Sequence, residues 1–220
     1  VEDGEEGEIC CYGPNVMRGY WKREKETKEV MSLAPDGKTP LFHTGDLGRM
    51  SADGYLSITG RLKEQYKLEN GKYIVPTPIE NAIGMSRFIQ QVVLVGANRP
   101  HNIVLLVLDW AAVTTELSLD TETSVDDMLE TYVNDPNVKA LIDTELSQAC
   151  EYANMKKFET PVDWAIVAPF TVANDMLTPK MSVRRHMVVK AYDDLIDQMY
   201  ETAAVESKTR MMDECKMEAA

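Results

Sequence analysis

The chain has 220 residues, of which 44% are hydrophobic, and its formal net charge is −13. This length allows one or two domains with a hydrophobic core. The longest apolar runs, such as Ile103–Leu108, are far too short to span a bilayer, so no transmembrane segment is predicted. Nucleic-acid binding requires an extended positive face, which a chain this acidic disfavours.

The first part of the chain has a β-rich pattern. It predicts a strand at Glu8–Tyr12, a short charged helix at Arg23–Met31, and a hairpin that joins Leu47–Met50 to Tyr55–Thr59. The hairpin turns at Ser51-Ala52-Asp53-Gly54, where the Asp-Gly pair supplies the positive φ that a tight turn needs.

After Gly60-Arg61 the pattern changes to strands mixed with helices, which predicts a small α+β domain. In chain order we expect a helix at about Pro78–Ser86, strands at Gln91–Gly96 and Ile103–Asp109, two helices in an acidic region, a strand at Trp164–Ala168, and a final helix from about Ser182 to Ala203. Residues after Val205 lose apolar periodicity and are expected to fray.

The helix that follows Asn134 has the strongest local signals, because Asp135 can cap it and Pro136 suits its first position. Apolar residues at helical spacing predict a core-facing stripe on this helix: Val138, Leu141, Ile142, Leu146, Ala149 and Tyr152. A second such stripe is predicted on the final helix: Val183, Met187, Val188, Ala191, Leu195, Ile196 and Met199.

Cysteine usage indicates a reduced, intracellular protein. The four cysteines are Cys10, Cys11, Cys150 and Cys215. They have neither CxxC nor metal-ligand spacing, so no metal site is predicted. The three histidines, His43, His101 and His186, show no nucleophile–base arrangement and are expected to be structural or surface residues.

Basic residues gather in two islands, Gly60–Pro76 and Met176–Lys190, whereas Ala111–Tyr152 carries ten acidic residues against Lys139. Nucleic acid needs an extended positive face, and two short basic islands in an acidic chain do not provide one. The pattern therefore favours a small anionic ligand. Upstream of the first island, Asp46 directly follows Gly45, where the backbone can approach a ligand closely. A carboxylate that can hold a ribose diol and cations that can hold phosphate together suggest a nucleotide.

Four motifs in order resemble the adenylate-forming enzymes, and among them the long-chain fatty acyl-CoA synthetases. Gly7-Glu8-Ile9 and the segment VMRGYW at Val16–Trp21 are similar to the family's GE(I/L) and VMxGYW segments. HTGDL at His43–Leu47 resembles its TGD motif, and KLENGKY at Lys67–Tyr73 is the form typical of the long-chain branch. The likeness extends from the first residues to about Tyr192.

The resemblance implies an ATP-dependent long-chain fatty acid–CoA ligase that uses Mg²⁺ with ATP and takes CoA as co-substrate. Residues 1–62 would end the large AMP-binding domain, residues 63–204 would form a mobile C-terminal α+β lid domain, and residues 205–220 would be a frayed tail. The family's phosphate loop, adenine motif and fatty-acid tunnel lie upstream of anything in this chain. The resemblance therefore implies the C-terminal third of a longer enzyme, inactive without its N-terminal domain. It leaves open peripheral membrane association of the full enzyme, in the cytoplasm or at the cytosolic face of an organelle.

Residue by residue, the resemblance assigns the ribose hydroxyls to Asp46 and a second ribose and phosphate contact to Arg61, while Thr44 helps to place the α-phosphate. The alternatives from the sequence itself are a turn cap for Asp46 and a hairpin-closing salt bridge for Arg61. Lys63 falls at the family's domain hinge. In the thioester-forming step, Lys67 would supply a cation and Gly71 would admit the pantetheine arm of CoA closely to the backbone.

The chain departs from the family pattern at the lysine of the adenylation step. The family reads LTPTxKxKR, whereas Leu177–Arg185 reads LTPKMSVRR, so that Ser182 occupies the expected lysine position. Lys180 reaching the same phosphate from a shifted register is the favoured interpretation. Arg184 or Arg185 as the replacement cation, or a weakened adenylation, are the alternatives.

Two further functions stay open at this point. In the first, the chain is a non-catalytic or regulatory lid that binds nucleotide without turnover, which the Ser182 departure would explain. In the second, it is the tail of a peptide-synthetase adenylation domain, which predicts a carrier domain downstream, whereas the sequence to Ala220 shows none.

Overall fold

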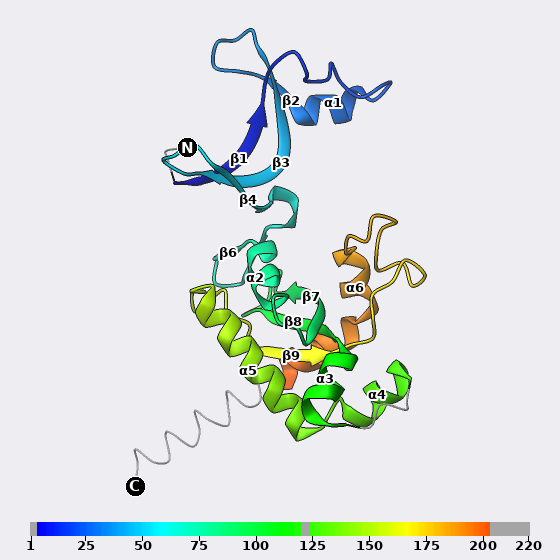
Figure 1. Cartoon of the computed structure of the whole chain (residues 1–220). Helices are drawn as coiled ribbons and strands as arrows, with labels where there is room; N and C mark the ends of the chain where they lie inside the picture. Colours follow the sequence, from blue (N-terminus) through cyan, green and yellow to red (C-terminus); the bar gives the residue numbers. More distant parts are fainter. Residues whose placement is uncertain (1–3, 120–123, 203–220) are drawn as a thin grey trace. The chain divides into compact units, whose positions relative to one another are not determined.

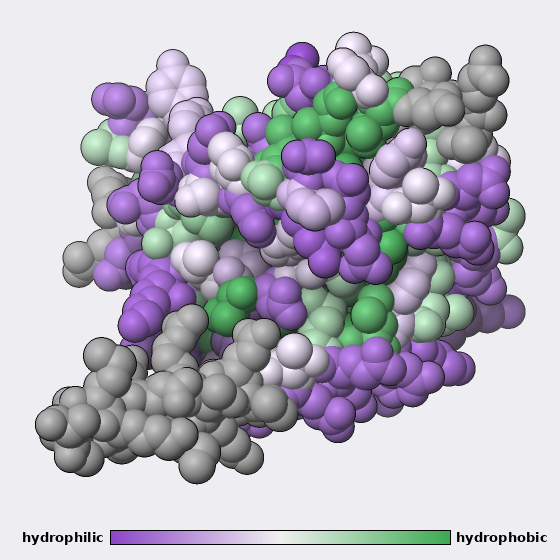
Figure 2. Space-filling model, turned by 90° about the horizontal axis from the view of Figure 1, so that it is seen from below, coloured by the Kyte–Doolittle hydropathy of each residue, from purple (hydrophilic) through white to green (hydrophobic). Residues whose placement is uncertain are grey.

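The computed structural model describes residues 4–119 and 124–202, and it divides the chain into two compact units, Val1–Pro78 and Ile79–Ala220. Strands and helices are mixed in both units, which confirms the α+β class (Figure 1). Among the described residues no helix is both long and apolar enough to cross a membrane. The viewed face in Figure 2 is largely hydrophilic, with smaller hydrophobic areas between the polar ones.

The first unit is built around one long strand, β3 (Pro40–Met50), in an antiparallel sheet. It pairs with β1 (Glu6–Cys11), with β2 (Met31–Leu33) and with β4 (Leu56–Arg61). The helix α1 (Glu24–Val30) precedes β2 directly. The predicted first strand, charged helix and hairpin are therefore confirmed, and Gly54 at the hairpin turn has a φ of 82°.

A short segment follows β4 and ends the first unit. It comprises the 3₁₀ turn η1 (Leu62–Glu64), the short strands β5 (Tyr66–Lys67) and β6 (Tyr73–Ile74), and the start of α2 (Pro76–Ile83). Leu68 and Ile74 are buried here, so the hairpin of β5 and β6 is anchored by apolar side chains at both of its ends. The glycine before Arg61 fits the same packing: a Cβ on Gly60 would lie 2.4 Å from Val75 Cγ1.

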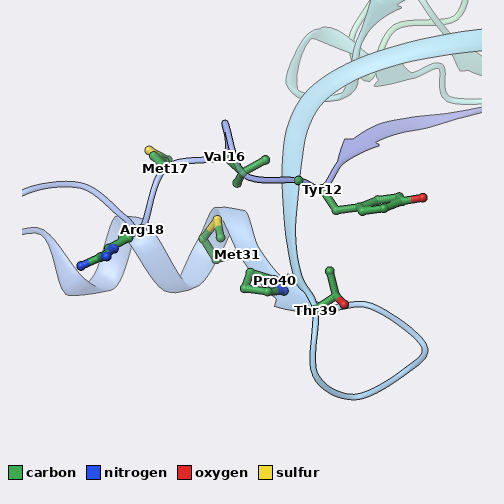
Figure 3. A pocket seen from close by; sticks show the side chains of 8 residues that line it. Tyr12, Val16, Met17, Arg18, Met31, Thr39 and Pro40 are labelled. Atoms are coloured by element: carbon green, nitrogen blue, oxygen red, sulfur yellow. The ribbon is translucent and has the colours of Figure 1, made fainter.

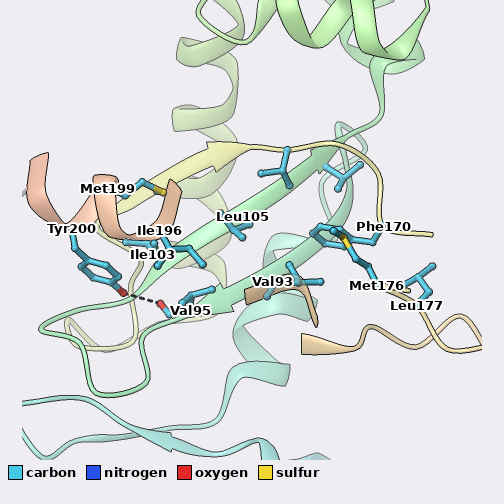
Figure 4. Packing of buried hydrophobic residues seen from close by; sticks show 13 residues of the cluster. Val93, Val95, Ile103, Leu105, Phe170, Met176, Leu177, Ile196, Met199 and Tyr200 are labelled. Carbon is cyan, nitrogen blue, oxygen red and sulfur yellow. Dashed lines mark hydrogen bonds between the residues drawn. The ribbon is translucent and has the colours of Figure 1, made fainter. Parts of the chain in front are cut away.

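The second unit has a three-stranded sheet in the order β7, β8, β9. The strand β7 (Ile89–Val95) runs antiparallel to β8 (Ile103–Leu108), and β9 (Asp163–Ile166) runs parallel to it. Every residue of β8 is buried, as expected for a central strand covered on both faces. One side packs on a cluster that includes Phe170, Ile196 and Tyr200, whose hydroxyl donates to the Val95 carbonyl at 3.3 Å (Figure 4).

The acidic region holds three helices in the described part of the chain, so the prediction of two was wrong. They are α3 (Trp110–Leu117), α4 (Val125–Tyr132) and α5 (Pro136–Tyr152). The apolar run ending at Asp109 predicts a strand up to this residue, whereas the Asp109 side chain caps α3 by accepting from the Ala112 amide at 3.1 Å. The predicted cap of α5 is confirmed, since Asp135 accepts from the Asn137 amide at 2.8 Å.

The end of the second unit differs from the predicted single helix. The helix α6 (Arg185–Ala191) begins three residues later than expected, and a separate helical segment, 193–202, follows an interruption at Tyr192. Ser182 and Val183 belong to a hairpin instead, in which Val183 bridges Leu177. Val183, Ala191 and Tyr152 are exposed and do not join the core stripes. The predicted helix end at Ala203 and the frayed tail lie outside the described residues.

Candidate functional site

Asp46 and Arg61 come together through the pairing of β3 with β4. The two residues are direct partners across the ladder, and Asp46 Oδ1 lies 3.0 Å from Arg61 Nε. The side chains are 26% and 64% exposed, respectively. An exposed pair of this kind contributes only about 0–1 kcal/mol to stability, so the contact leaves both groups able to exchange it for a ligand. The salt bridge considered as the alternative for Arg61 is present, and it does not conflict with ligand binding.

The Thr44-Gly45-Asp46 motif lies in a β-bulge of β3. Between the pairs Glu8–Leu47 and Cys10–His43, β1 advances by two residues while β3 advances by four. Gly45 takes a φ of 73°, which glycine adopts without steric cost. Bulges reorient side chains and are frequent beside active sites. Here the bulge accounts for the glycine before Asp46.

Thr44 supports this bulge from within. Its hydroxyl donates to the Ile9 carbonyl at 2.7 Å and accepts from the Asp46 amide at 3.0 Å. The hydroxyl proton is therefore already donated to a backbone carbonyl of the sheet, and the hydroxyl oxygen positions the backbone of Asp46. A role of Thr44 at the α-phosphate stays a prediction and would require this hydroxyl to change partner.

Lys67 lies at the start of the β5–β6 hairpin, opposite Tyr73. Its Nζ is 5.6 Å from the centre of the Tyr73 ring, a cation–π contact that holds the ammonium at the surface. The loop closes through bonds from the Leu68 amide to the Lys72 carbonyl and from the Gly71 amide to the Leu68 carbonyl, at 2.9 and 3.0 Å. Gly71 has a φ of 84° and an open surface, apart from Lys67 Cε at 3.7 Å from a Cβ placed there.

Lys180 lies in a loop with the same bonding pattern in the second unit. The Thr178 amide donates to the Ser182 carbonyl at 2.9 Å, and the Met181 amide donates to the Thr178 carbonyl at 2.8 Å. Met181 takes the left-handed position that glycine holds in the other loop, with a φ of 63°. Pro179, Lys180 and Met181 thus form a three-residue hairpin loop that exposes Lys180.

The two arginines considered as alternatives to Lys180 both have carboxylate partners. Arg184 Nη1 lies 2.7 Å from Asp175 Oδ1. Arg185 is more deeply held: it contacts Glu80 Oε1 at 2.7 Å and donates to the Leu94 carbonyl at 2.7 Å. Within the described part of the chain, Lys180 is the cation of the three for which no ion pair is seen. The exposed Arg184–Asp175 pair could exchange for a ligand as the Asp46–Arg61 pair could, so the pairing argues chiefly against Arg185, whose partner Glu80 is less exposed.

Substitutions at the two left-handed positions, 71 and 181, are expected to change the free energy of unfolding in opposite directions. A left-handed conformation costs a residue with a side chain about 1–2 kcal/mol, and Met181→Gly removes this cost. Glycine also gains conformational entropy in the unfolded state, which offsets part of the gain, so the net stabilisation should be up to about 1 kcal/mol. Gly71→Ala should destabilise it by about 1 kcal/mol for the same reason. Urea unfolding measures both changes. Equal signs for the two variants would contradict the assignment of these loops to one class.

Lys63 occupies the middle of η1 and is exposed. The boundary between the compact units falls later, between Pro78 and Ile79. A domain boundary at Leu62/Lys63 and a hinge at Lys63 stay predictions, because both depend on the movement of one domain against the other.

A pocket of about 380 Å³ lies in the first unit, beside the VMRGYW segment (Figure 3). Val16, Met17 and Arg18 of this segment line it together with Met31 and Pro40 at the starts of β2 and β3. None of the site residues predicted from the sequence lines this pocket. We assign no ligand to this pocket.

Comparison with known proteins establishes the class. Residues 63–204 match the family described as the AMP-binding enzyme C-terminal domain, and the chain belongs to this family. Curated relatives are long-chain acyl-CoA synthetases. The peroxisomal long chain acyl-CoA synthetase 7 of Arabidopsis thaliana is 33% identical over 202 residues, which is 88% of this chain and 27% of the relative. The long-chain-fatty-acid–CoA ligase 5 of Mus musculus is 33% identical over 199 residues, 90% of this chain and 28% of the relative.

Solved structures agree on the fold. The A-PCP didomain of carboxylic acid reductase from Segniliparus rugosus, in complex with AMP, is similar with a TM-score of 0.72 and 23% identity, covering 94% of this chain and 26% of that chain. The chain thus spans just over a quarter of the length of the curated relatives and solved structures that it matches.

Proposed function

We propose that this chain is the C-terminal part of an ATP-dependent long-chain fatty acid–CoA ligase. The observation that carries the proposal is the Asp46–Arg61 pair, in which a half-buried carboxylate and an exposed guanidinium meet beside a glycine bulge. Such a pair can bind the two hydroxyls of a ribose and an adjacent phosphate at once. The family and the curated relatives support a nucleotide as the ligand and a fatty acid as the second substrate.

The proposed reaction has two steps. The fatty-acid carboxylate attacks the α-phosphorus of ATP, so that an acyl-adenylate forms and pyrophosphate leaves. The thiol of CoA, after loss of its proton, then attacks the acyl carbonyl and AMP leaves. Mg²⁺ bound to ATP would supply further neutralisation of the phosphate charge. Both steps develop negative charge, which positioned cations stabilise.

The described residues divide this work between them. Asp46 and Arg61 hold the nucleoside part in both steps. Lys180, exposed on its hairpin loop, supplies the cation for the phosphate in the first step. Lys67, held by Tyr73, supplies the cation for the second, where Gly71 admits the pantetheine arm of CoA to the backbone. Lys63 would be the hinge that exchanges the two lysines by absorbing the φ and ψ change.

The share of the relatives that this chain covers supports a division of labour with an N-terminal part that binds adenine and the acyl chain. We expect the 220 residues by themselves to lack turnover. We place the complete enzyme inside the cell, in the cytoplasm or peripherally at the cytosolic face of an organelle membrane.

A regulatory lid that binds nucleotide without turnover is the second candidate. The observation that favours it is Ser182, whose side chain cannot provide a cation at the position where the family has lysine. The two candidates share the nucleotide site and differ in fatty-acid-dependent chemistry.

Replacing Asp46 tests the nucleotide site that both candidates require. In the complete enzyme Asp46→Ala is expected to weaken AMP binding by about 1–3 kcal/mol, the range for losing hydrogen bonds to a charged group. Titration calorimetry with AMP measures this change. Asp53→Asn, an exposed aspartate in the turn of the same hairpin, is the control and should leave AMP affinity unchanged. Unchanged affinity in Asp46→Ala would refute the assignment.

A further inference from the structure

Three side chains with metal-binding atoms converge on one face of the sheet in the first unit. Glu8 and Cys10 are two residues apart on β1, and His43 is the direct partner of Cys10 on β3. One carboxylate oxygen, the Cys10 Sγ and a His43 ring nitrogen all lie within 4.8 Å of one another. The set was missed in the sequence because its members come from strands more than thirty residues apart.

Two of these side chains face the same atom. His43 Nδ1 lies 2.8 Å from Glu8 Oε2 and 3.5 Å from Cys10 Sγ. A nucleophilic relay would need the thiol and the carboxylate on opposite ring nitrogens, one to take a proton and the other to orient the ring. Nδ1 has a single site, so it cannot serve both groups by hydrogen bonding. One cation between the three atoms would satisfy all of them.

The other ring nitrogen is already held. His43 Nε2 lies 2.8 Å from Ser32 Oγ, which projects from β2 on the opposite edge of β3. Metal-binding histidines usually donate their second ring nitrogen to such a partner, which fixes the tautomer and the ring orientation. In the metal-bound state Nε2 would carry the proton and donate it to Ser32, and Nδ1 would give up the proton that it now donates to Glu8, so that its lone pair faces the ion.

We propose that Glu8, Cys10 and His43 form a Zn²⁺-binding site. One thiolate, one imidazole and one carboxylate are the ligand types that zinc takes, and they are too soft a set for Mg²⁺ or Ca²⁺. Tetrahedral ligands at zinc bond lengths are about 3.5 Å apart, close to the distance between Cys10 Sγ and His43 Nδ1. The shorter Glu8–His43 contact is a hydrogen bond that the ion would replace.

The site keeps one position for solvent. Glu8 and His43 are 24% and 32% exposed, so an ion can enter and take water as its fourth ligand. Binding converts the Cys10 thiol to a thiolate and releases its proton to solvent.

The ion would lie beside the bulge that carries Asp46. Glu8 Oε1 accepts from the Gly45 amide at 3.1 Å, so the carboxylate that binds the ion also holds the bulge. The site itself depends only on the first unit and does not rest on the proposed ligase function.

Cobalt substitution tests the site, because a Co²⁺–thiolate bond absorbs in the near ultraviolet and Zn²⁺ is silent. Titration of the reduced 220-residue chain with Co²⁺ should give this band, and addition of Zn²⁺ should abolish it. Cys10→Ser and His43→Gln should each weaken Co²⁺ binding at least tenfold. Cys11→Ser, which alters the neighbouring exposed thiol, should retain both the band and the affinity.

Circular dichroism and thermal unfolding establish that each variant is folded before it is titrated. A folded wild-type chain without the band would overturn the proposal. Equal Co²⁺ affinity in Cys10→Ser and Cys11→Ser would also overturn it, because the thiolate would then come from another cysteine. If Cys10→Ser does not fold, loss of the band in folded His43→Gln supports the site and its retention refutes it.

Discussion

Replacing Lys180 with alanine in the complete enzyme is expected to slow acyl-adenylate formation by about 10²–10³-fold, as for the loss of one positioned electrostatic contact. The exposed loop of Pro179, Lys180 and Met181 presents this ammonium, whereas Arg184 and Arg185 are paired with carboxylates. Fatty-acid-dependent exchange of pyrophosphate into ATP measures the first step. The attack of CoA on a supplied acyl-adenylate should stay within about twofold of the wild type, because it does not require this cation.

Placing a lysine at position 182 tests whether Lys180 performs the role of the lysine that the family has there. If Lys180 replaces the lysine that the family has at the position of Ser182, then Ser182→Lys should restore much of the exchange in the Lys180→Ala background. Both residues lie in one hairpin, closed by the bond between the Thr178 amide and the Ser182 carbonyl. Ser182→Gln is the matched control, with a long side chain but no charge, and should not restore activity.

Two outcomes would contradict the role of Lys180. If Lys180→Ala exchanges normally while Arg184→Ala does not, the cation lies at the start of α6. If neither change matters, the lid does not take part in adenylation and the regulatory candidate gains. Arg185→Ala is less informative, since its pair with Glu80 is partly buried and removal of one partner of a buried pair destabilises the fold.

Lys67→Ala is expected to show the reverse pattern, with thioester formation slowed by about 10²-fold or more and pyrophosphate exchange nearly unchanged. The ammonium lies over the Tyr73 ring, and among the described residues no ion pair of Lys67 is seen, so its charge is available to a ligand. Single-turnover transfer from acyl-adenylate to CoA measures the loss. Lys72→Ala, a lysine in the same hairpin, is the control and should leave both steps intact.

An equal loss of both steps in Lys67→Ala would contradict a role restricted to the thioester step. It would indicate instead that the hairpin of β5 and β6 supports the nucleotide site as a whole. Since an opposite effect is predicted for Lys180→Ala, the two variants together test whether one mobile domain presents different cations in different orientations.

The sequence predicted most strands and the start of α5, because the signals for these elements are local. Asp135 and Pro136 mark the start of α5 without reference to anything distant, and the Asp53-Gly54 turn defines its own hairpin. The apolar runs at β7 and β8 are equally direct. The class of the fold and the family follow from these elements and from the motif order.

The errors arose where a local pattern competes with a contact that the sequence does not reveal. Ser182 and Val183 fit the periodicity of the last helix, yet the bridge from Val183 to Leu177 and the bonds of Thr178 hold them in a hairpin. Asp109 looked like the end of a strand and proved to be a helix cap. Tyr152 continues the helical stripe in the sequence but is 79% exposed at the end of α5.

The part of the candidate site whose residues lie in sequence motifs could be predicted. The pairing of Asp46 with Arg61 follows from the hairpin register, and the motif identified both. The bulge around Gly45 and the convergence of Glu8, Cys10 and His43 could not be predicted, because they depend on how β1 and β3 are aligned over a long sequence separation.

The product balance of the complete enzyme, supplied with ATP, Mg²⁺, palmitate and CoA, tests the proposed function most directly. We predict equal amounts of AMP, pyrophosphate and palmitoyl-CoA, with none formed when palmitate is omitted. Binding of AMP without fatty-acid-dependent release of pyrophosphate would contradict a ligase and would identify the chain as part of a nucleotide-binding regulatory protein.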